Sequence, residues 1–127
     1  MRKLVCGVFV ITLLKAGAAR AITAEDFQVK TTQDLLDLCT VPASDPDAQQ
    51  AIHFCHGYLL GAFHYHLAES DGPDAAKRLV CMPSGVTRND AVAMFVEWVK
   101  AHPQYLKEFP VETEFRFLIE KWPCAKK

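Results

Sequence analysis

The sequence has no surplus of basic residues, with 14 Lys and Arg against 15 Asp and Glu, and no glycine-rich phosphate loop. A nucleic-acid-binding face is therefore not favoured. It also lacks clean apolar–polar alternation and an Asn-Gly or Asp-Gly turn between apolar strands, the usual signals of a β-sheet. Ser44, Ser70 and Ser84 lie in turn-like surroundings, and Glu112 and Glu114, two apart on a helix, face different ways. These absences favour an all-α protein that is not an enzyme.

Motifs for metal and haem are also missing, although four of the five histidines fall within residues 51–66. There is no His-Glu-x-x-His and no Cys-x-x-Cys-His. His53 and His64 would lie about 16 Å apart along a helix, too far to bind one ion. His53 and His56 could share an ion but would need ligands from elsewhere. His64 and His66 would point apart. We predict no metal and no cofactor, with the histidines at helix flanks; a pH-sensing role stays open.

Long apolar runs are confined to the N-terminus. Arg2 and Lys3 precede an apolar run from Leu4 to Leu14, which closes on Ala19-Arg20-Ala21. This is the layout of a secretory signal peptide, and the run is shorter than the roughly 20 residues of a membrane span. A short membrane anchor is the alternative. We expect a signal peptide at 1–21 and one domain at 22–127, located in the periplasm and free of the membrane after cleavage.

Cysteines are few, but their number is informative. Cys6 lies inside the predicted signal, and Cys39, Cys55, Cys81 and Cys124 remain. An even number in a short exported chain predicts two disulfides. Three pairings are possible and the residues alone do not choose among them; free buried thiols are the alternative.

What the sequence does contain is a series of helix signals. Caps, apolar stripes and prolines mark successive segments at 31–40, 44–68, 74–80, 87–102 and 110–122. The first is capped by Thr31 or Thr32, the second has Pro46 at its first helical position, and Thr87 begins the fourth. We therefore predict a single compact domain of four to five helices, stapled by two disulfides.

Two glycines interrupt the second of these helices. Gly57 and Gly61 are four residues apart and share one face, where each costs about 1 kcal/mol relative to alanine. We interpret them as a helix-packing site that lets another backbone approach closely; the alternative is a glycine that is merely tolerated.

Three stretches, FCHGYLLGAF, VCMPSGVTRNDAVAMFVEWVKAHPQYL and KWPC, resemble the Rap/Tai family of periplasmic immunity proteins. The resemblance covers about residues 31–124. Its matching positions are Cys39, Cys55, Gly57, Tyr58, Gly61, Cys81, Pro83, Val86, Thr87, His102, Pro103, Pro123 and Cys124.

This resemblance implies a small helical, disulfide-stapled protein that forms a homodimer. It also implies a partner, a peptidoglycan amidase delivered by a neighbouring bacterium's type VI secretion system, which the protein binds and inhibits. The partner-contacting residues lie outside the shared motif. Because the compact helical shape is also similar to the periplasmic acid-stress chaperone HdeA, a chaperone is the main alternative, and an orphan periplasmic binding module is another.

Within such a fold we expect Cys39 to pair with Cys55, across a short connection suited to a helical hairpin. Cys81 and Cys124 would then tie the Cys-Met-Pro loop to the C-terminus. The turn that carries Glu69, Ser70, Asp71 and Asp74 is the candidate partner-binding site, because polar turns on a rigid scaffold carry recognition. We expect these four polar side chains to be exposed and the turn to be acidic in character; a merely solvated turn is the alternative.

Overall fold

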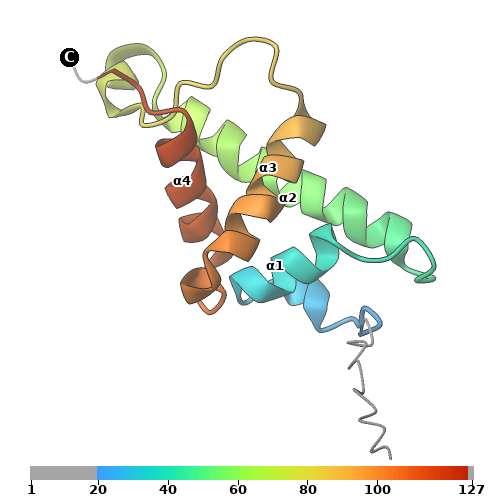
Figure 1. Ribbon diagram of the computed structural model, residues 1–127. Coiled ribbons are helices and arrows are strands. Elements are labelled where there is room, and N and C mark those ends of the chain that lie inside the picture. Colours follow the sequence, from blue (N-terminus) through green and yellow to red (C-terminus); the bar gives the residue numbers. More distant parts are fainter. Residues whose placement is uncertain (1–19, 126–127) are drawn as a thin grey trace, which may run out of the picture.

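The structure, a computed structural model, describes residues 20–125, so most of the predicted signal peptide and Cys6 lie outside the described residues. It consists of helices and connecting loops, with no strand longer than a single bridge in the described part (Figure 1). The four α-helices are α1 (Thr32–Cys39), α2 (Ala48–Glu69), α3 (Arg88–Ala101) and α4 (Pro110–Lys121). Three 3₁₀ turns are η1 (Asp26–Gln28), η2 (Gly72–Lys77) and η3 (Pro103–Tyr105). The all-α prediction is confirmed.

Two helices begin where the sequence predicts. Thr31 caps α1 and Thr87 caps α3, and each forms a reciprocal capping box with the acid three residues on. The start of α2 was predicted two residues too early, at Pro46. The Asp45 carboxylate accepts a hydrogen bond from the backbone N–H of Asp47 at 2.8 Å, which holds this segment in a turn before the helix starts.

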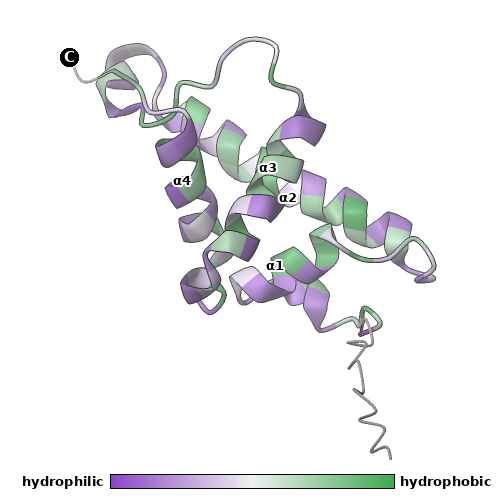
Figure 2. Cartoon of the chain, in the orientation of Figure 1, coloured by the Kyte–Doolittle hydropathy of each residue, from purple (hydrophilic) through white to green (hydrophobic). Residues whose placement is uncertain are grey.

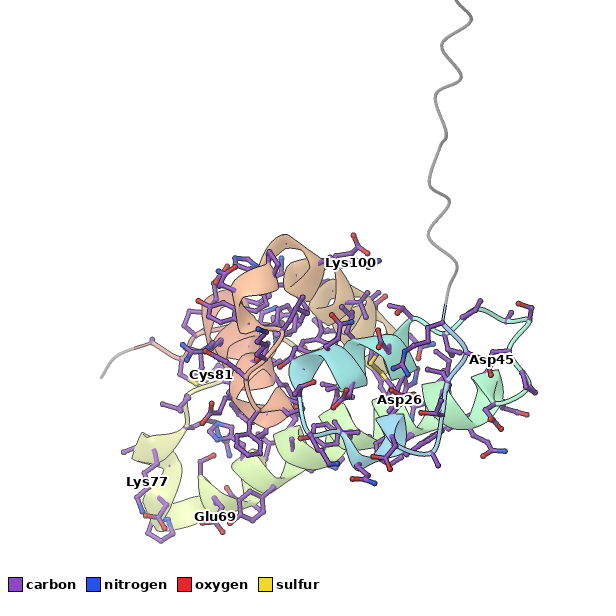
Figure 3. All side chains as sticks on the ribbon, turned by 90° about the horizontal axis from the view of Figure 1, so that it is seen from below. Asp26, Asp45, Glu69, Lys77, Cys81 and Lys100 are labelled. Carbon is purple, nitrogen blue, oxygen red and sulfur yellow. A yellow bond between two sulfur atoms is a disulfide. The ribbon has the colours of Figure 1, made fainter. Side chains whose placement is uncertain are left out.

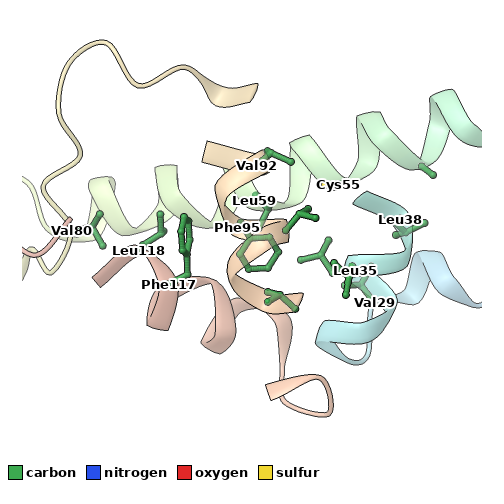
Figure 4. Packing of buried hydrophobic residues seen from close by; sticks show 14 residues of the cluster. Val29, Leu35, Leu38, Cys55, Leu59, Val80, Val92, Phe95, Phe117 and Leu118 are labelled. Carbon is green, nitrogen blue, oxygen red and sulfur yellow. The ribbon is translucent and has the colours of Figure 1, made fainter. Parts of the chain in front are cut away.

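The long helix α2 is the spine of the domain, and the three shorter helices lie along one side of it (Figures 1 and 4). The apolar side chains between them form one core, in which Leu35, Cys55, Phe95 and Phe117 come from four different helices. Hydrophobic and hydrophilic residues are mixed along the whole of α2 (Figure 2). Of the helices in residues 20–125, none combines the length and hydropathy that a membrane crossing requires.

The start of α1 is joined to the segment before α4. The backbone N–H groups of Thr32 and Gln33 donate to the carbonyls of Glu108 and Leu106, both at 2.9 Å. The fully buried Thr32 hydroxyl also donates to the Thr113 hydroxyl at 2.7 Å. Since the first N–H groups of a helix have no partner within the helix, these bonds satisfy them and fix α1 against α4.

Both disulfides pair as predicted. Cys39 at the end of α1 is bonded to Cys55 in α2, with a Cα–Cα distance of 5.2 Å. Cys81 is bonded to Cys124, with a Cα–Cα distance of 4.9 Å. Cys55 is fully buried, whereas Cys81 is exposed at the surface near the C-terminal end of α2 (Figure 3).

Candidate partner-binding face

The turn after α2 was predicted to expose four polar side chains, and the prediction is wrong for Ser70. Glu69 and Asp71 are exposed and Asp74 is half-buried, but Ser70 is only 1% exposed. Its hydroxyl donates to the carbonyl of His66 at 2.6 Å and accepts from Nε of Arg78 at 3.4 Å. Ser70 therefore closes the end of the helix, where its hydroxyl ties the turn back to α2, and it offers little surface to a partner.

The predicted acidic character of this turn is largely balanced by two basic residues that follow it. Lys77 lies 2.7 Å from Asp74, and Arg78 lies 3.8 Å from Asp71. The stretch predicted as the binding turn, Glu69–Asp74, ended before both basic residues. The 3₁₀ turn η2 places them next to the acidic side chains. The turn therefore presents a mixed charge pattern, and long-range steering by its acids alone is weaker than the sequence suggested.

His66 fixes the segment that follows η2, a role that sequence reasoning missed. Its Nε2 accepts a hydrogen bond from the backbone N–H of Leu79 at 3.2 Å, and its ring lies edge-on to Phe115 at 5.1 Å. Burial, and to a lesser extent the charge of Arg78, lower the pKa of His66. A neutral ring is what the acceptor role requires, so the histidine anchors the chain where it leaves η2.

Residues 79–81 are also tied to the C-terminal segment. Val80 and Pro123 form an antiparallel bridge, the Cys81 N–H donates to the carbonyl of Trp122 at 2.9 Å, and the Cys124 N–H donates to that of Leu79 at 3.2 Å. The disulfide lies within this contact. A short strand pairing, which sequence reasoning did not predict, therefore supports one end of the following loop.

The loop over residues 82–87 leaves this anchor and arches away from the helices before α3 begins (Figure 1). Pro83, Ser84 and Gly85 are exposed. Gly85 has φ +104°, a backbone conformation that L side chains rarely adopt, so glycine makes this turn possible. Because the capping box of Thr87 holds its far end, the loop is a protrusion fixed at both ends.

Gly57 and Gly61 lie on a side of α2 that the other α-helices described in the structure leave open, although Phe27 of η1 packs edge-on against Phe54 on this side, with ring centroids 5.5 Å apart. Both are exposed, and a Cβ atom built on either would meet nothing within 4 Å. As a contact inside the domain, the predicted helix-packing role is wrong, because the helices that pack on α2 use its opposite side. Phe54, 37% exposed, and Tyr65, 68% exposed, fall on the same face by helical geometry.

The clustered histidines of α2 differ in exposure, because successive positions of a helix face different sides. His53 and His64 are exposed, and His56 is half-buried with a pKa lowered by burial and then by the charges of Arg88 and His53. Across residues 20–125, no three His, Cys, Asp or Glu side chains are placed to hold one metal ion. The absence of a metal stays a prediction.

Glu114 is a second residue whose position the sequence did not reveal. As expected, it faces differently from the exposed Glu112, but its direction is inward: it is 2% exposed, and its Oε2 has no hydrogen-bond partner in the described chain. Burial raises the pKa of Glu114 to about 9, so the carboxyl is protonated and neutral at physiological pH.

Comparison with known proteins identifies a family for this chain but no individual relative. Neither a curated protein nor a solved structure matches the chain. The family of Rap1a immunity proteins matches residues 31–124, from the cap of α1 to the last cysteine, a range that holds both disulfides and the fixed loop. The chain therefore belongs to the Rap1a immunity protein family.

Proposed function

We propose that this chain is a periplasmic immunity protein that binds and inhibits a peptidoglycan amidase delivered by a type VI secretion system. The observation that carries the proposal is the family match over residues 31–124, which spans all four α-helices. Inhibition here is binding rather than chemistry, because an inhibitor needs only a rigid surface that blocks the enzyme's cleft. Membership of an immunity family implies that the partner is a secreted effector protein. That this effector is an amidase and is delivered by a type VI secretion system is our proposal.

The surface proposed to contact the effector lies at the C-terminal end of α2. It joins Glu69, the last residue of α2, and the η2 turn with Asp71 and Asp74 to the fixed loop over residues 82–87. A loop held by a disulfide at one end and a capping box at the other loses little conformational entropy on binding, which favours tight inhibition. The loop protrudes, as an element that enters a cleft must (Figure 1).

Export is supported by the surroundings of Ile22, the residue expected to begin the mature chain. Its side chain is half-buried against the core, and its backbone nitrogen lies 3.1 Å from Oδ2 of Asp45. Cleavage after Ala21 would convert that nitrogen into an ammonium group beside a carboxylate, a stronger charge-assisted hydrogen bond. Cleavage there also removes Arg20, which pairs with Asp26 and Asp37, but it leaves both hydrogen bonds from Thr23 to Asp26 in place.

A homodimer is the second part of the assembly we propose, and the open side of α2 is the surface offered for it. Gly57 and Gly61 leave a flat strip with room for another backbone, and the aromatic rings of Phe54 and Tyr65 lie partly exposed on it. Burial of such rings is a large contribution to an interface. This surface faces away from the shorter helices, so a second copy on it leaves the core unchanged.

The acid-activated chaperone is the alternative, and Glu114 makes a contribution against it. A carboxyl that is protonated in the fold but ionised in the unfolded chain makes folding more favourable as the pH falls. Acid-triggered opening needs the opposite trend. Protection of unfolded clients at acid pH, together with failure to bind any amidase, would favour the chaperone.

The test is to mix the mature protein with type VI amidases, including any encoded beside it, and to follow peptidoglycan cleavage. Two matched pairs of variants locate the surface: Ser84→Trp on the loop against Ser44→Trp at the other end of α2, and Glu69→Lys against Glu25→Lys. Figure 3 shows Glu69 far from Asp26 and Asp45, the neighbours in sequence of the control positions Glu25 and Ser44.

We expect a cognate amidase to be inhibited, with Ser84→Trp and Glu69→Lys weakening inhibition at least about tenfold. Ser44→Trp and Glu25→Lys should stay within about twofold of the unchanged protein, since both are exposed and distant. The immunity proposal fails if no amidase of this class is bound. The location fails if the two members of each pair behave alike.

A further inference from the structure

A cavity of about 210 Å³ lies where α2, α3 and α4 meet the fixed loop. Its walls are mostly apolar, and Figure 4 shows four of the side chains at this junction, Leu59, Phe95, Phe117 and Leu118. Thr87 and Arg88, both exposed, stand at its rim and mark the side on which it reaches solvent. An apolar cavity of roughly 150 Å³ is enough to bind benzene, so this one has room for a substituted ring.

One polar side chain, Glu114, contributes to the buried part of the wall. The Oε2 atom of Glu114 has no hydrogen-bond partner among residues 20–125, although nearly all buried polar atoms in proteins have one. The carboxyl is neutral because burial raises its pKa to about 9. It therefore presents one O–H donor and one C=O acceptor, and a ligand that pairs with Oε2 removes the cost of leaving that atom unpaired.

The walls also restrict the shape of such a ligand. Phe63, Phe95 and Phe117 all line the cavity, and the rings of Phe95 and Phe117 meet edge to face at 5.8 Å. An aromatic ring continues this arrangement favourably. A hydroxyl on the ring suits Glu114 because it can donate or accept, whichever oxygen carries the proton, whereas an amine or a carboxylate would bring a charge into an apolar wall.

We propose that this cavity binds the ring of a small neutral phenol, with its hydroxyl hydrogen-bonded to Oε2 of Glu114. Nothing in this site depends on the amidase proposal, since the cavity and its carboxyl belong to the isolated domain. A phenolic ring has two possible sources, a free small molecule or the tyrosine side chain of a bound protein, and the experiment distinguishes them.

The test measures binding of p-cresol and of toluene, which differ by the hydroxyl alone, to the purified protein by NMR titration at about pH 7. The readout is the ratio of the toluene Kd to the p-cresol Kd. Glu114→Gln keeps a neutral donor and acceptor and should keep the ratio within about threefold, whereas Glu114→Met removes both and should lower it at least about tenfold. This ratio cancels the general loss of apolar fit that either substitution causes.

Measurements on the unchanged protein keep the proposal testable if Glu114→Met does not fold. p-Cresol should give ring contacts to Phe95 and Phe117 and shift the Glu114 carboxyl carbon resonance, and toluene should give the contacts without that shift. N-acetyl-tyrosinamide then separates the sources: its binding assigns the site to a tyrosine of a partner, and its exclusion assigns it to a free phenol. No saturable p-cresol binding, or contacts elsewhere on the surface, overturns the proposal.

Discussion

Asp26, in the N-terminal region, and Glu114, in α4, are buried to almost the same degree, at 3% and 2% exposed. Their pKa values nevertheless move in opposite directions. Burial raises the pKa of both carboxyls, and for Glu114 nothing opposes it. For Asp26 the N–H and hydroxyl of Thr23, at 2.7 and 2.8 Å, and, in the chain before cleavage, the guanidinium of Arg20 outweigh burial and lower the pKa. The hydrogen bonds to Asp26 keep it charged, whereas Glu114, buried and with Oε2 unpaired among the described residues, is neutral.

The two disulfides also differ in their surroundings, one lying near the N-terminal helices and the other near the end of α4. The Cys39–Cys55 bond joins α1 to α2 beside the core, where Leu35, Leu38 and Ala51 already hold the two helices together. The Cys81–Cys124 bond lies at the surface and joins two irregular segments that share only a short backbone pairing. The first lies among core contacts that join the same two helices, whereas the second lies at the surface beside the backbone pairing that supports the fixed loop.

Replacing both cysteines of one bond by alanine should give the largest effects. The chain-entropy model predicts a loss of about 4 kcal/mol in unfolding free energy for the separation of 43 residues between Cys81 and Cys124. It predicts about 3 kcal/mol for the separation of 16 between Cys39 and Cys55. Urea denaturation measures both losses.

Hydrogen exchange separates the two variants further. Without the Cys81–Cys124 bond, amide protection of residues 79–81 should fall well below that of α1 and α2; without the Cys39–Cys55 bond it should fall only with global stability. Equal losses of protection at residues 79–81 in both variants, at matched stability, would contradict the difference between the regions.

Glu114→Gln should give the next largest effect, seen in the pH dependence of stability. The folded pKa of Glu114, about 9, lies above the unfolded value near 4.5, so its stabilising contribution is fully present below about pH 4.5 and is lost as the pH rises toward 9. The slope reaches about 1.4 kcal/mol per pH unit, or about 3 kcal/mol between pH 4.5 and about pH 7. Urea denaturation across this range should show that decline in the unchanged protein and a flatter profile in Glu114→Gln. Matching profiles would mean that Glu114 is ionised in the fold.

Asp26→Asn should have the smallest effect and the opposite pH dependence. Because the folded pKa of Asp26 is lowered, its contribution is present above the unfolded value near 3.8 and is lost as the pH falls through the folded value. Losing the charged acceptor of two Thr23 donors should cost about 2 kcal/mol at neutral pH. The exposed Glu25→Gln, measured beside it, should change little. A deficit of Asp26→Asn that persists undiminished in acid would show that the charge is not the cause.

Local sequence signals predicted the helices well where the capping partner is near in the chain. Thr31 and Thr87 cap their helices through acids three residues on, and both boundaries were found. The start of α2 was missed because Asp45 bonds to a turn instead of to the helix. A helix boundary that is set by a capping partner three residues away can be predicted from the sequence. A boundary that depends on a competing turn is harder to predict.

The candidate site was predicted less well, because its parts are assembled by contacts between distant segments. Ser70 was placed in the correct turn, but its burial depends on Arg78 and on the fold of η2. His66 was seen only as one of several histidines, since its partner is the backbone N–H of Leu79, 13 residues on. Gly57 and Gly61 share a face, as helical periodicity requires, but periodicity does not say which face the other helices cover.

The sequence by itself determined that this protein is helical, that its four domain cysteines can form two bonds and where its capped helices start. These features follow from short-range capping, spacing and composition, which need no knowledge of distant residues. Only the tertiary structure decided that Glu114 lines a cavity with Oε2 unpaired among residues 20–125 while Asp26 is hydrogen-bonded, and that the other α-helices leave the glycine side of α2 open. Both depend on which side of α2 the three shorter helices cover, because burial is a property of packing and not of the residue itself.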